Sequence, residues 1–210
     1  MFDIINSFTE VDIKNNFVAI GSYIGKDKIP EHSVLVIKYN NEINHFHYGG
    51  KEILFDNIYN ENCFHKITET INAELIPSFI MMCKRVMKKA NPRYGYFYSG
   101  EYYDTNGVHF SEKEISETMT CSGFCLNILK GFLEQDYIFY NDWNTPSYPT
   151  NDYLERFANH FNIDKDKISE SHRRISPLEL LCSGYFSSLP IRKSQIDLKV
   201  DETAEYLLNY

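Results

Sequence analysis

The clearest structural pattern of the sequence lies in EHSVLVIKYNNEINHFHY, residues 31–48. Apolar and β-branched residues fill the segments on both sides of Asn40-Asn41, and paired asparagines are typical of the tight turn that joins two antiparallel strands. The pattern predicts a β-hairpin whose strands cover residues 32–39 and 42–48. An antiparallel sheet is therefore expected at the centre of the protein.

Three histidines distinguish this hairpin. His32 opens the first strand, and His45 and His47 both lie on the returning strand. Because successive side chains of a strand point to opposite faces, His45 and His47 share one face, and the hairpin brings them beside His32. An imidazole is well suited to move a proton at neutral pH, so this face is a candidate for general-base chemistry. Two histidines at this spacing can also chelate zinc, which keeps a metal site at His45 and His47 open as an alternative.

A second stretch, TCSGFCLNILKGF at residues 120–132, predicts a helix that begins with a thiol. Apolar residues follow Cys121 at helical spacing, and we expect them to form the buried face of a helix over residues 121–133. This apolar stripe consists of Phe124, Ile128, Leu129 and Phe132. Free amides and the helix dipole stabilise negative charge at a helix N-terminus, so Cys121 is a candidate nucleophile. Cys125 lies one turn further along, and the sequence leaves open which of the two thiols is exposed.

The rest of the chain combines strand and helix patterns without an internal repeat. Three further apolar runs are typical of strands: residues 14–24, 51–55 and 194–200. Three segments have helical periodicity or helix-start signals: one that begins near 73–77 and stops at Asn91-Pro92, one over 152–161 and one over 177–186. Ser111 and Glu114 have the spacing of an N-terminal capping box. These elements predict an α+β protein, with an antiparallel sheet packed against helices.

The composition excludes several classes of protein. The 210 residues include 21 basic and 29 acidic side chains, and the net charge of −8 argues against binding of nucleic acid and against adsorption to an anionic membrane through bulk charge. No apolar run is long enough to span a membrane. The five cysteines lack Cys-x-x-Cys spacing, so we expect no metal or other cofactor. Free thiols without an export signal indicate a cytoplasmic protein. We expect a single catalytic domain over residues 1–210, in which residues 141–210 form a C-terminal extension packed on the rest.

Together, the hairpin and the thiol-led helix resemble the circularly permuted papain-like superfamily, the NlpC-like and lecithin retinol acyltransferase-like group of cysteine hydrolases and acyltransferases. In that group a histidine opens a strand, a second polar residue, often histidine, lies on the next strand, and a cysteine begins a later helix. Here Cys121 lies 89 residues after His32, with Thr120 before it and an aromatic residue three positions later. SPLELLCSGYF at residues 176–186 is similar to a helix start near the end of some bacterial members. The resemblance covers about residues 17–135.

The resemblance implies a permuted papain-like (NlpC-like) fold and a role for each matching residue. It implies Cys121 as the nucleophile, His32 as the base and His45 as the residue that orients the base. The interval from His32 to His45 is one residue longer than in the family pattern, and Asn-Asn replaces the usual glycine-rich turn, so His47 competes for the third role. His109, which precedes the thiol-led helix, competes with His32 for the role of base.

The function expected from the resemblance is that of a cysteine peptidase-like or amidase-like thiol hydrolase, or of an acyl transferase. The substrate would be a small peptide, another amide or a lipid ester. An amide is favoured because lipid-acting relatives often carry a hydrophobic anchor, which this sequence lacks. A non-catalytic ligand-binding module that keeps the fold, and the zinc site at His45 and His47, are the alternatives. The other cysteines (63, 83, 125 and 182) are expected in the core, and the remaining histidines (65, 160 and 172) in solvent.

Overall fold

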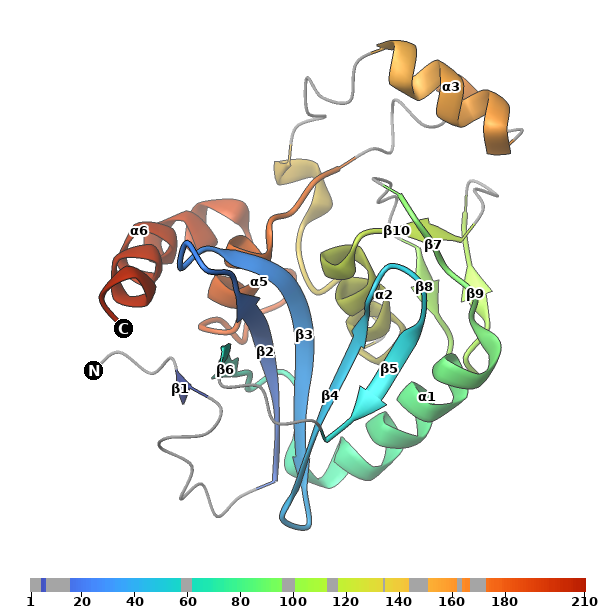
Figure 1. Cartoon of the computed structure of the whole chain (residues 1–210). Helices are drawn as coiled ribbons and strands as arrows, with labels where there is room; N and C mark the ends of the chain where they lie inside the picture. Colours follow the sequence, from blue (N-terminus) through green and yellow to red (C-terminus); the bar gives the residue numbers. More distant parts are fainter. Residues whose placement is uncertain are drawn as a thin grey trace.

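The computed structural model describes residues 5–6, 16–57, 62–95, 101–112, 117–133, 135–143, 151–161, 164–166 and 173–210. Its centre is a six-stranded sheet in the order β1-β6-β2-β3-β4-β5, in which all neighbouring strands run antiparallel. Its strands are β1 (Ile5–Asn6), β2 (Phe17–Ile24), β3 (Pro30–Tyr39), β4 (Glu42–Tyr48), β5 (Ile53–Asp56) and β6 (Cys63–Ile67). The sheet is strongly curved, and helices fill its concave side (Figure 1). The α+β class predicted from the sequence is confirmed.

The predicted hairpin is confirmed as β3 and β4. Asn40 and Asn41 both have positive φ, 49° and 67°, which is the backbone geometry of a two-residue turn whose twist matches that of the flanking strands. Pairing starts at Tyr39 opposite Glu42, directly beside the turn. Asparagine tolerates positive φ better than other non-glycine residues, so the Asn-Asn pair fixes the hairpin register without an added residue.

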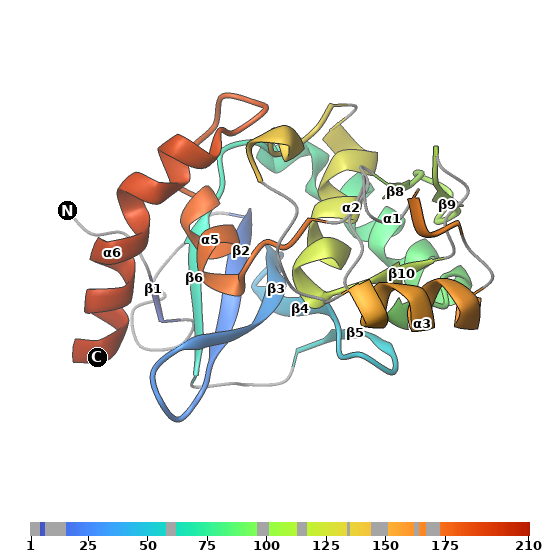
Figure 2. The same ribbon diagram turned by 90° about the horizontal axis from the view of Figure 1, so that it is seen from above.

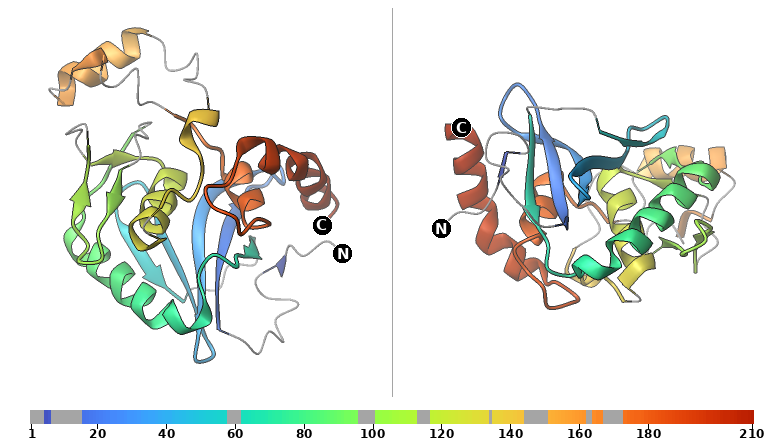
Figure 3. Two further views of the ribbon diagram at one scale, coloured as in Figure 1. Left: turned by 180° about the vertical axis from the view of Figure 1, so that it is seen from behind. Right: turned by 90° about the horizontal axis from the view of Figure 1, so that it is seen from below.

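The helices are α1 (Ile76–Lys89), α2 (Cys121–Leu133), α3 (Asn151–Phe161), α5 (Pro177–Ser183) and α6 (Lys193–Asn209), with short 3-10 turns η1 (Ala73–Leu75) and η2 (Tyr140–Asp142). Short strands pair as β7 (Arg93–Tyr94) with β10 (Thr118–Met119), and as β8 (Tyr102–Tyr103) with β9 (His109–Phe110). Helix α2 packs on β3 and β4, α5 packs on β2 and β3, and α6 lies outside α5 (Figures 2 and 3). Within the described ranges, none of the helices is long and apolar enough to cross a bilayer.

The apolar stripe of α2 forms the centre of the core. Phe124 is fully buried, and its ring centroid lies 5.2 Å from that of Phe46 on β4 and 5.8 Å from that of Tyr103 on β8. Ile128 and Leu129 are also fully buried, as predicted. Phe132, the last member of the stripe, is partly buried against this core. Apolar burial of this kind is the main force that holds α2 against the sheet.

Two predictions of secondary structure need comment. The strand predicted over residues 194–200 is wrong, because this segment belongs to α6. The alternation of apolar and polar residues there is local, whereas the buried residues Ile196, Thr203 and Leu207 recur at the spacing of one helix face. Of the predicted capping box, Glu114 lies outside the described residues, and the Ser111 hydroxyl donates a hydrogen bond to Glu101 at 3.1 Å.

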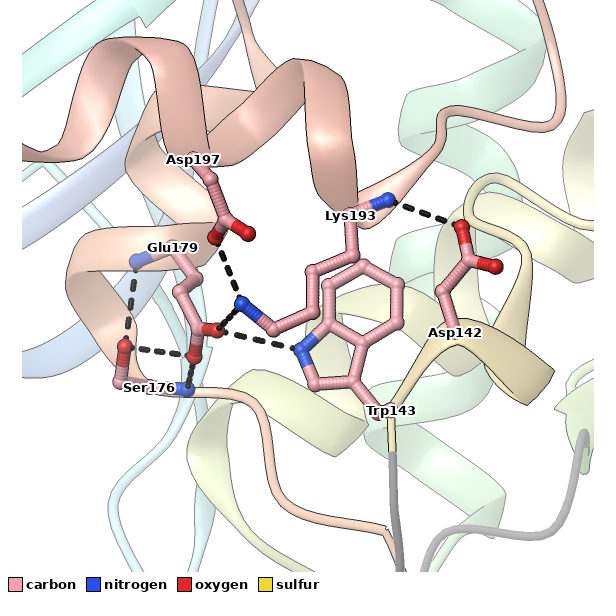
Figure 4. A network of polar contacts seen from close by, with 6 residues as sticks. All are labelled: Asp142, Trp143, Ser176, Glu179, Lys193 and Asp197. Carbon is pink, nitrogen blue, oxygen red and sulfur yellow. Dashed lines mark hydrogen bonds and ion pairs between the residues drawn. The ribbon is translucent and has the colours of Figure 1, made fainter.

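A polar network joins the helices of the C-terminal part to η2 (Figure 4). The indole N–H of Trp143 donates to Glu179 Oε1 at 3.2 Å, and Lys193 Nζ lies 3.4 Å from the same oxygen. The backbone N–H of Lys193 donates to Asp142 at 3.0 Å. Ser176 and Glu179 form the reciprocal capping box at the start of α5, which confirms the helix start predicted there. The network therefore ties the starts of α5 and α6 to the chain segment that follows α2.

Gly131, near the end of α2, allows β8 to approach the helix closely. A Cβ atom at this position would overlap the carbonyl oxygen of Tyr103. An Ala substitution inside a helix normally stabilises it by about 1 kcal/mol relative to Gly. Here we expect Gly131→Ala to lower the free energy of unfolding by about 1–3 kcal/mol, because backbone must move to accept the methyl group.

Urea denaturation followed by circular dichroism measures this change. Gly49→Ala is the matched control, because a Cβ atom there would meet its nearest neighbour at 3.8 Å, an ordinary contact. We expect that control to stay within about 0.5 kcal/mol of the wild type. A stabilising Gly131→Ala substitution would contradict the close approach of α2 and β8.

Candidate active site

The site forms where β3 and β4 separate. Their pairing ends at Leu35 opposite Phe46. Beyond this point β3 continues beside β2 towards Pro30, and β4 continues beside β5 to Tyr48. The end of the hairpin away from its turn is therefore open, and β3 and β4 diverge on either side of α2 in Figure 1.

Cys121 is held at this opening by the backbone of β3. The amide N–H of Ser33 donates to Cys121 Sγ at 3.5 Å. Ser33 directly follows His32 in the chain, so the thiol lies against the residue next to the predicted base. A sulfur atom that accepts an amide hydrogen bond can hold more negative charge, which suits a nucleophile.

Helix α2 begins at Cys121 because Thr120 caps it. The Thr120 side chain accepts a hydrogen bond from Gly123 N–H at 3.0 Å, and its carbonyl accepts one from Phe124 N–H at 2.9 Å. This is the geometry of an N-cap residue, which satisfies amides that the first helical turn leaves free. Cys121 is thus the first residue of the helix, as the sequence predicted.

A second hydrogen bond locks the start of α2 onto β3. The hydroxyl groups of Ser33 and Ser122 lie 2.8 Å apart, and both side chains are almost completely buried. Two buried hydroxyls that satisfy each other fix the position of both chain segments, because leaving either one unpaired would cost about 1–3 kcal/mol. The Ser33–Ser122 pair therefore determines how deeply the thiol sits between the strands.

The predicted base pairs with His47 rather than with His45. Nε2 of His32 lies 2.8 Å from Nδ1 of His47, and the two rings meet edge to face with centroids 4.9 Å apart. Nδ1 of His45 is instead 2.9 Å from the Tyr23 hydroxyl. The expectation that His45 orients His32 is corrected accordingly. The physical reason is the regular two-residue turn, which pairs His45 with Val36 and leaves His47 two residues closer to the open end, where His32 lies.

Burial keeps this histidine pair neutral. The pKa of His32 is lowered to about 4, chiefly by desolvation and also by the nearby His47. Desolvation also lowers the pKa of His47 to about 4, although Asp56 opposes the shift. Both rings are therefore uncharged at pH 7, and a neutral imidazole has the free lone pair that a general base needs. If Nε2 of His32 carries the proton of the shared hydrogen bond, its Nδ1 is the atom with that lone pair.

The alternative base, His109, has another partner, and the alternative nucleophile, Cys125, is more deeply buried than Cys121. His109 on β9 contacts the carboxylate of Glu101 at 3.1 Å. Cys125 is fully buried, and desolvation raises the pKa of its thiol well above the ordinary value, whereas Cys121 is 7% exposed. Of the two thiols on α2, Cys121 thus belongs to the more exposed residue. The other cysteines (63, 83 and 182) are buried and free, as predicted.

The prediction that His65 lies in solvent is wrong. His65 is fully buried on β6, opposite Gly21 of β2, and its ring stacks on that of Phe17 at 5.5 Å. Desolvation lowers its pKa to about 3. His160 is exposed, as predicted, and His172 lies outside the described residues.

Sequence reasoning missed three residues of the site: Tyr23, Ser33 as a partner of the sulfur, and Ser122. The signal for Tyr23 was present, because an antiparallel strand at 14–24 placed beside 32–39 brings it opposite His32, its observed partner. The serines carried no such signal, since their contact depends on where α2 meets the sheet. In the part of the chain that the structure describes, no three His, Cys, Asp or Glu side chains are arranged to hold a metal ion.

No protein-family model, curated protein or solved structure matches this chain significantly.

The lowered histidine pKa values predict a dependence of stability on pH. A histidine of the unfolded chain titrates near pH 6.5, whereas His32 and His47 titrate near pH 4 in the folded protein. Between these values the unfolded state binds more protons, so the free energy of unfolding falls as the pH is lowered from 6.5 to 4. In His47→Gln we expect the loss of unfolding free energy at low pH to be smaller by about 1–2 kcal/mol. The substitution removes one of the two histidines whose pKa is lowered by folding.

Urea denaturation at pH 6.5 and at pH 4.5 measures the effect for each protein. His160→Gln is the matched control, because it removes an exposed imidazole. Equal dependence on pH in the wild type and in His47→Gln would mean that His47 is not kept neutral by the fold.

Proposed function

We propose that this protein is a thiol-dependent hydrolase or acyl transferase that acts on an amide, with Cys121 as nucleophile, His32 as base and His47 as the residue that orients the base. One observation carries the proposal: the first residue of α2 is a thiol bonded to the amide of Ser33, the residue after His32 in the chain, and the ring of His32 is bonded to that of His47. A thiol at a helix start, a histidine on the adjacent strand and a second histidine bonded to the first are the residue types that nucleophilic catalysis uses.

In the first step, His32 Nδ1 takes the proton of the Cys121 thiol. The thiolate then attacks the carbonyl carbon of the substrate, and the carbonyl π electrons move onto its oxygen. His47 holds the His32 ring through Nε2 and stabilises the imidazolium that forms, since its Nδ1 accepts the shared proton. This step requires Nδ1 of His32 to lie within about 4 Å of the sulfur.

In the second step, the carbonyl re-forms and the bond to the leaving amine breaks, while His32 returns the proton to the amine. The product is a thioester on Cys121. A water molecule, or an acceptor amine in the transferase reaction, then attacks this thioester with His32 again as base, and the thiol is regenerated. The cycle balances without a metal, an oxidant or a reductant.

The architecture that would support this chemistry is a permuted papain-like fold. In support, the histidines precede the cysteine in the chain, the histidines lie on adjacent strands of an antiparallel sheet, and the cysteine begins a helix packed on those strands. The helix dipole at Cys121 favours the thiolate and the oxyanion of the tetrahedral intermediate alike.

A non-catalytic binding module is the second candidate. It is favoured by the small exposure of Cys121, 7%, because a substrate carbonyl must reach the sulfur. The two candidates differ in turnover and in the reactivity of the thiol, which the following experiments measure.

The first test is hydrolysis. Peptide p-nitroanilides and fatty-acyl p-nitrophenyl esters serve as amide and ester probes, and we expect turnover of the amides. Cys121→Ala should lower the rate at least about 10³-fold, since it removes the nucleophile, while the free energy of unfolding changes by about 1 kcal/mol or less. Cys182→Ser serves as the control, because Cys182 lies on α5 and has no part in the proposed reaction. Unchanged turnover in Cys121→Ala would exclude the proposed nucleophile.

The second test separates the histidines of β4. Alkylation of Cys121 by iodoacetamide at pH 7, followed by mass spectrometry of the modified peptide, reports how well the base activates the thiol. We expect His32→Gln to slow alkylation about tenfold, and His47→Gln to slow it several-fold, because His47 bonds the base. His45→Gln should have the smaller effect, since Nδ1 of His45 bonds Tyr23. A larger effect at His45 than at His47 would reverse the assignment of the third residue.

A further inference from the structure

The ring of Tyr23 on β2 lies among the three histidines of the hairpin. Its centroid is 5.5 Å from that of His32, 5.7 Å from that of His45 and 5.4 Å from that of His47. The contact with His32 is stacked, with an interplanar angle of 24°, and the contact with His47 is edge to face, at 78°. A single aromatic side chain thus contacts both rings of the proposed base pair.

The position of Tyr23 follows from the strand register. Tyr23 is paired with His32 across β2 and β3. The register shifts between Tyr23 and Ile24, which marks a bulge at the end of the pairing. On its other side, Tyr23 is paired with Cys63 of β6. Backbone pairing on both sides fixes where this side chain projects, and packing against three rings restricts its rotamer.

The hydroxyl group of Tyr23 acts on His45. Burial raises the pKa of this hydroxyl far above its ordinary value, so it stays protonated. It lies 2.9 Å from Nδ1 of His45 and is able to donate to it. Donation to Nδ1 requires that atom to be unprotonated, which places the proton of a neutral His45 on Nε2. The hydroxyl holds the ring of His45, and when it is the donor it selects the tautomer with the proton on Nε2.

We propose that Tyr23 is a positioning residue of the site, which aligns the His32–His47 pair through ring contacts and holds His45 apart from that pair through its hydroxyl. The proposal rests on the proposed function, because it concerns the base of that reaction. His45 and His47 share one face of β4, and a single orienting group is needed. The Tyr23 hydroxyl bonds His45, so His47 is the residue that bonds His32.

Titratable groups from five elements surround this side chain. His32 projects from β3, and His45 and His47 from β4. The other groups are Cys63 of β6, Asp56 of β5 and Cys125 of α2, which act electrostatically on the Tyr23 hydroxyl, and His65 of β6, which acts on His45. The experiment therefore compares the wild type and the Tyr23 variants over the same pH range, because these groups are identical in those proteins.

The test uses Tyr23→Met, which removes the ring, and Tyr23→Phe, which removes only the hydroxyl. The readout is the rate of Cys121 alkylation by iodoacetamide from pH 5 to pH 9, with His32→Gln as reference. We expect Tyr23→Met to slow alkylation at pH 7 about tenfold and to shift its pH–rate profile to that of His32→Gln, because the base is misaligned. Tyr23→Phe should stay within about threefold of the wild type and keep its profile, since the ring contacts remain.

The outcomes separate the two proposals. If His32→Gln alkylates like the wild type, the proposed function fails. If His32→Gln is slow and a folded Tyr23→Met matches the wild type in rate and profile, only the role of Tyr23 is overturned. If circular dichroism shows Tyr23→Met to be unfolded, the role of Tyr23 is tested instead by imidazole ¹H–¹⁵N spectra of the Tyr23→Phe variant with ¹⁵N-labelled histidine. We expect His45 to shift towards the Nδ1-protonated tautomer there, and an unchanged His45 tautomer would overturn the proposal.

Discussion

The hydrogen bond from the Ser33 amide to Cys121 Sγ joins two segments that lie 88 residues apart in the chain. It exists because β3 and β4 stop pairing at Leu35 and Phe46, so that the following part of β3 is available to the start of α2. The hydroxyl pair of Ser33 and Ser122 reinforces the same junction at 2.8 Å. Everything proposed for the site depends on this junction, because it sets the sulfur beside the strand that carries His32.

The junction is stable because the apolar face of α2 packs in the hydrophobic core. Phe124 packs against rings from β4 and β8, and Gly131 lets β8 approach the helix backbone closely. These contacts fix the helix axis, while Thr120 fixes its first turn. A thiol at a helix start is a useful nucleophile only if the helix cannot slide, and interiors packed at crystal-like density provide that rigidity. The core and the site are therefore parts of one arrangement.

The face of the sheet that carries His32, His45, His47, His65 and Tyr23 shows how burial changes protonation. Four histidines and Tyr23 occupy it, and desolvation lowers the pKa of each of these histidines. In water such a cluster would be partly charged at pH 6, and its members would repel one another. Within the protein the neutral rings form two separate hydrogen-bonded pairs, His32 with His47 and His45 with the Tyr23 hydroxyl. Neutrality at pH 7 leaves each imidazole a lone pair for accepting a proton, and the lowered pKa values make His32 and His47 weaker bases than a free imidazole.

Much of this protein could be read from local sequence. The Asn-Asn turn determined the hairpin, since positive φ at both positions favours that residue type, and the Thr-Cys start with its apolar stripe determined α2. The strand expected at 194–200 failed because period-two alternation over a few residues does not outweigh a longer helical face. Tertiary structure alone decided the choice of His47 over His45, the burial of His65 and the junction of Ser33 with Cys121. The first and the third depend on where β3 and β4 stop pairing, and the second depends on the place of β6 between β1 and β2; each is a contact between strands or helices that the local sequence does not specify.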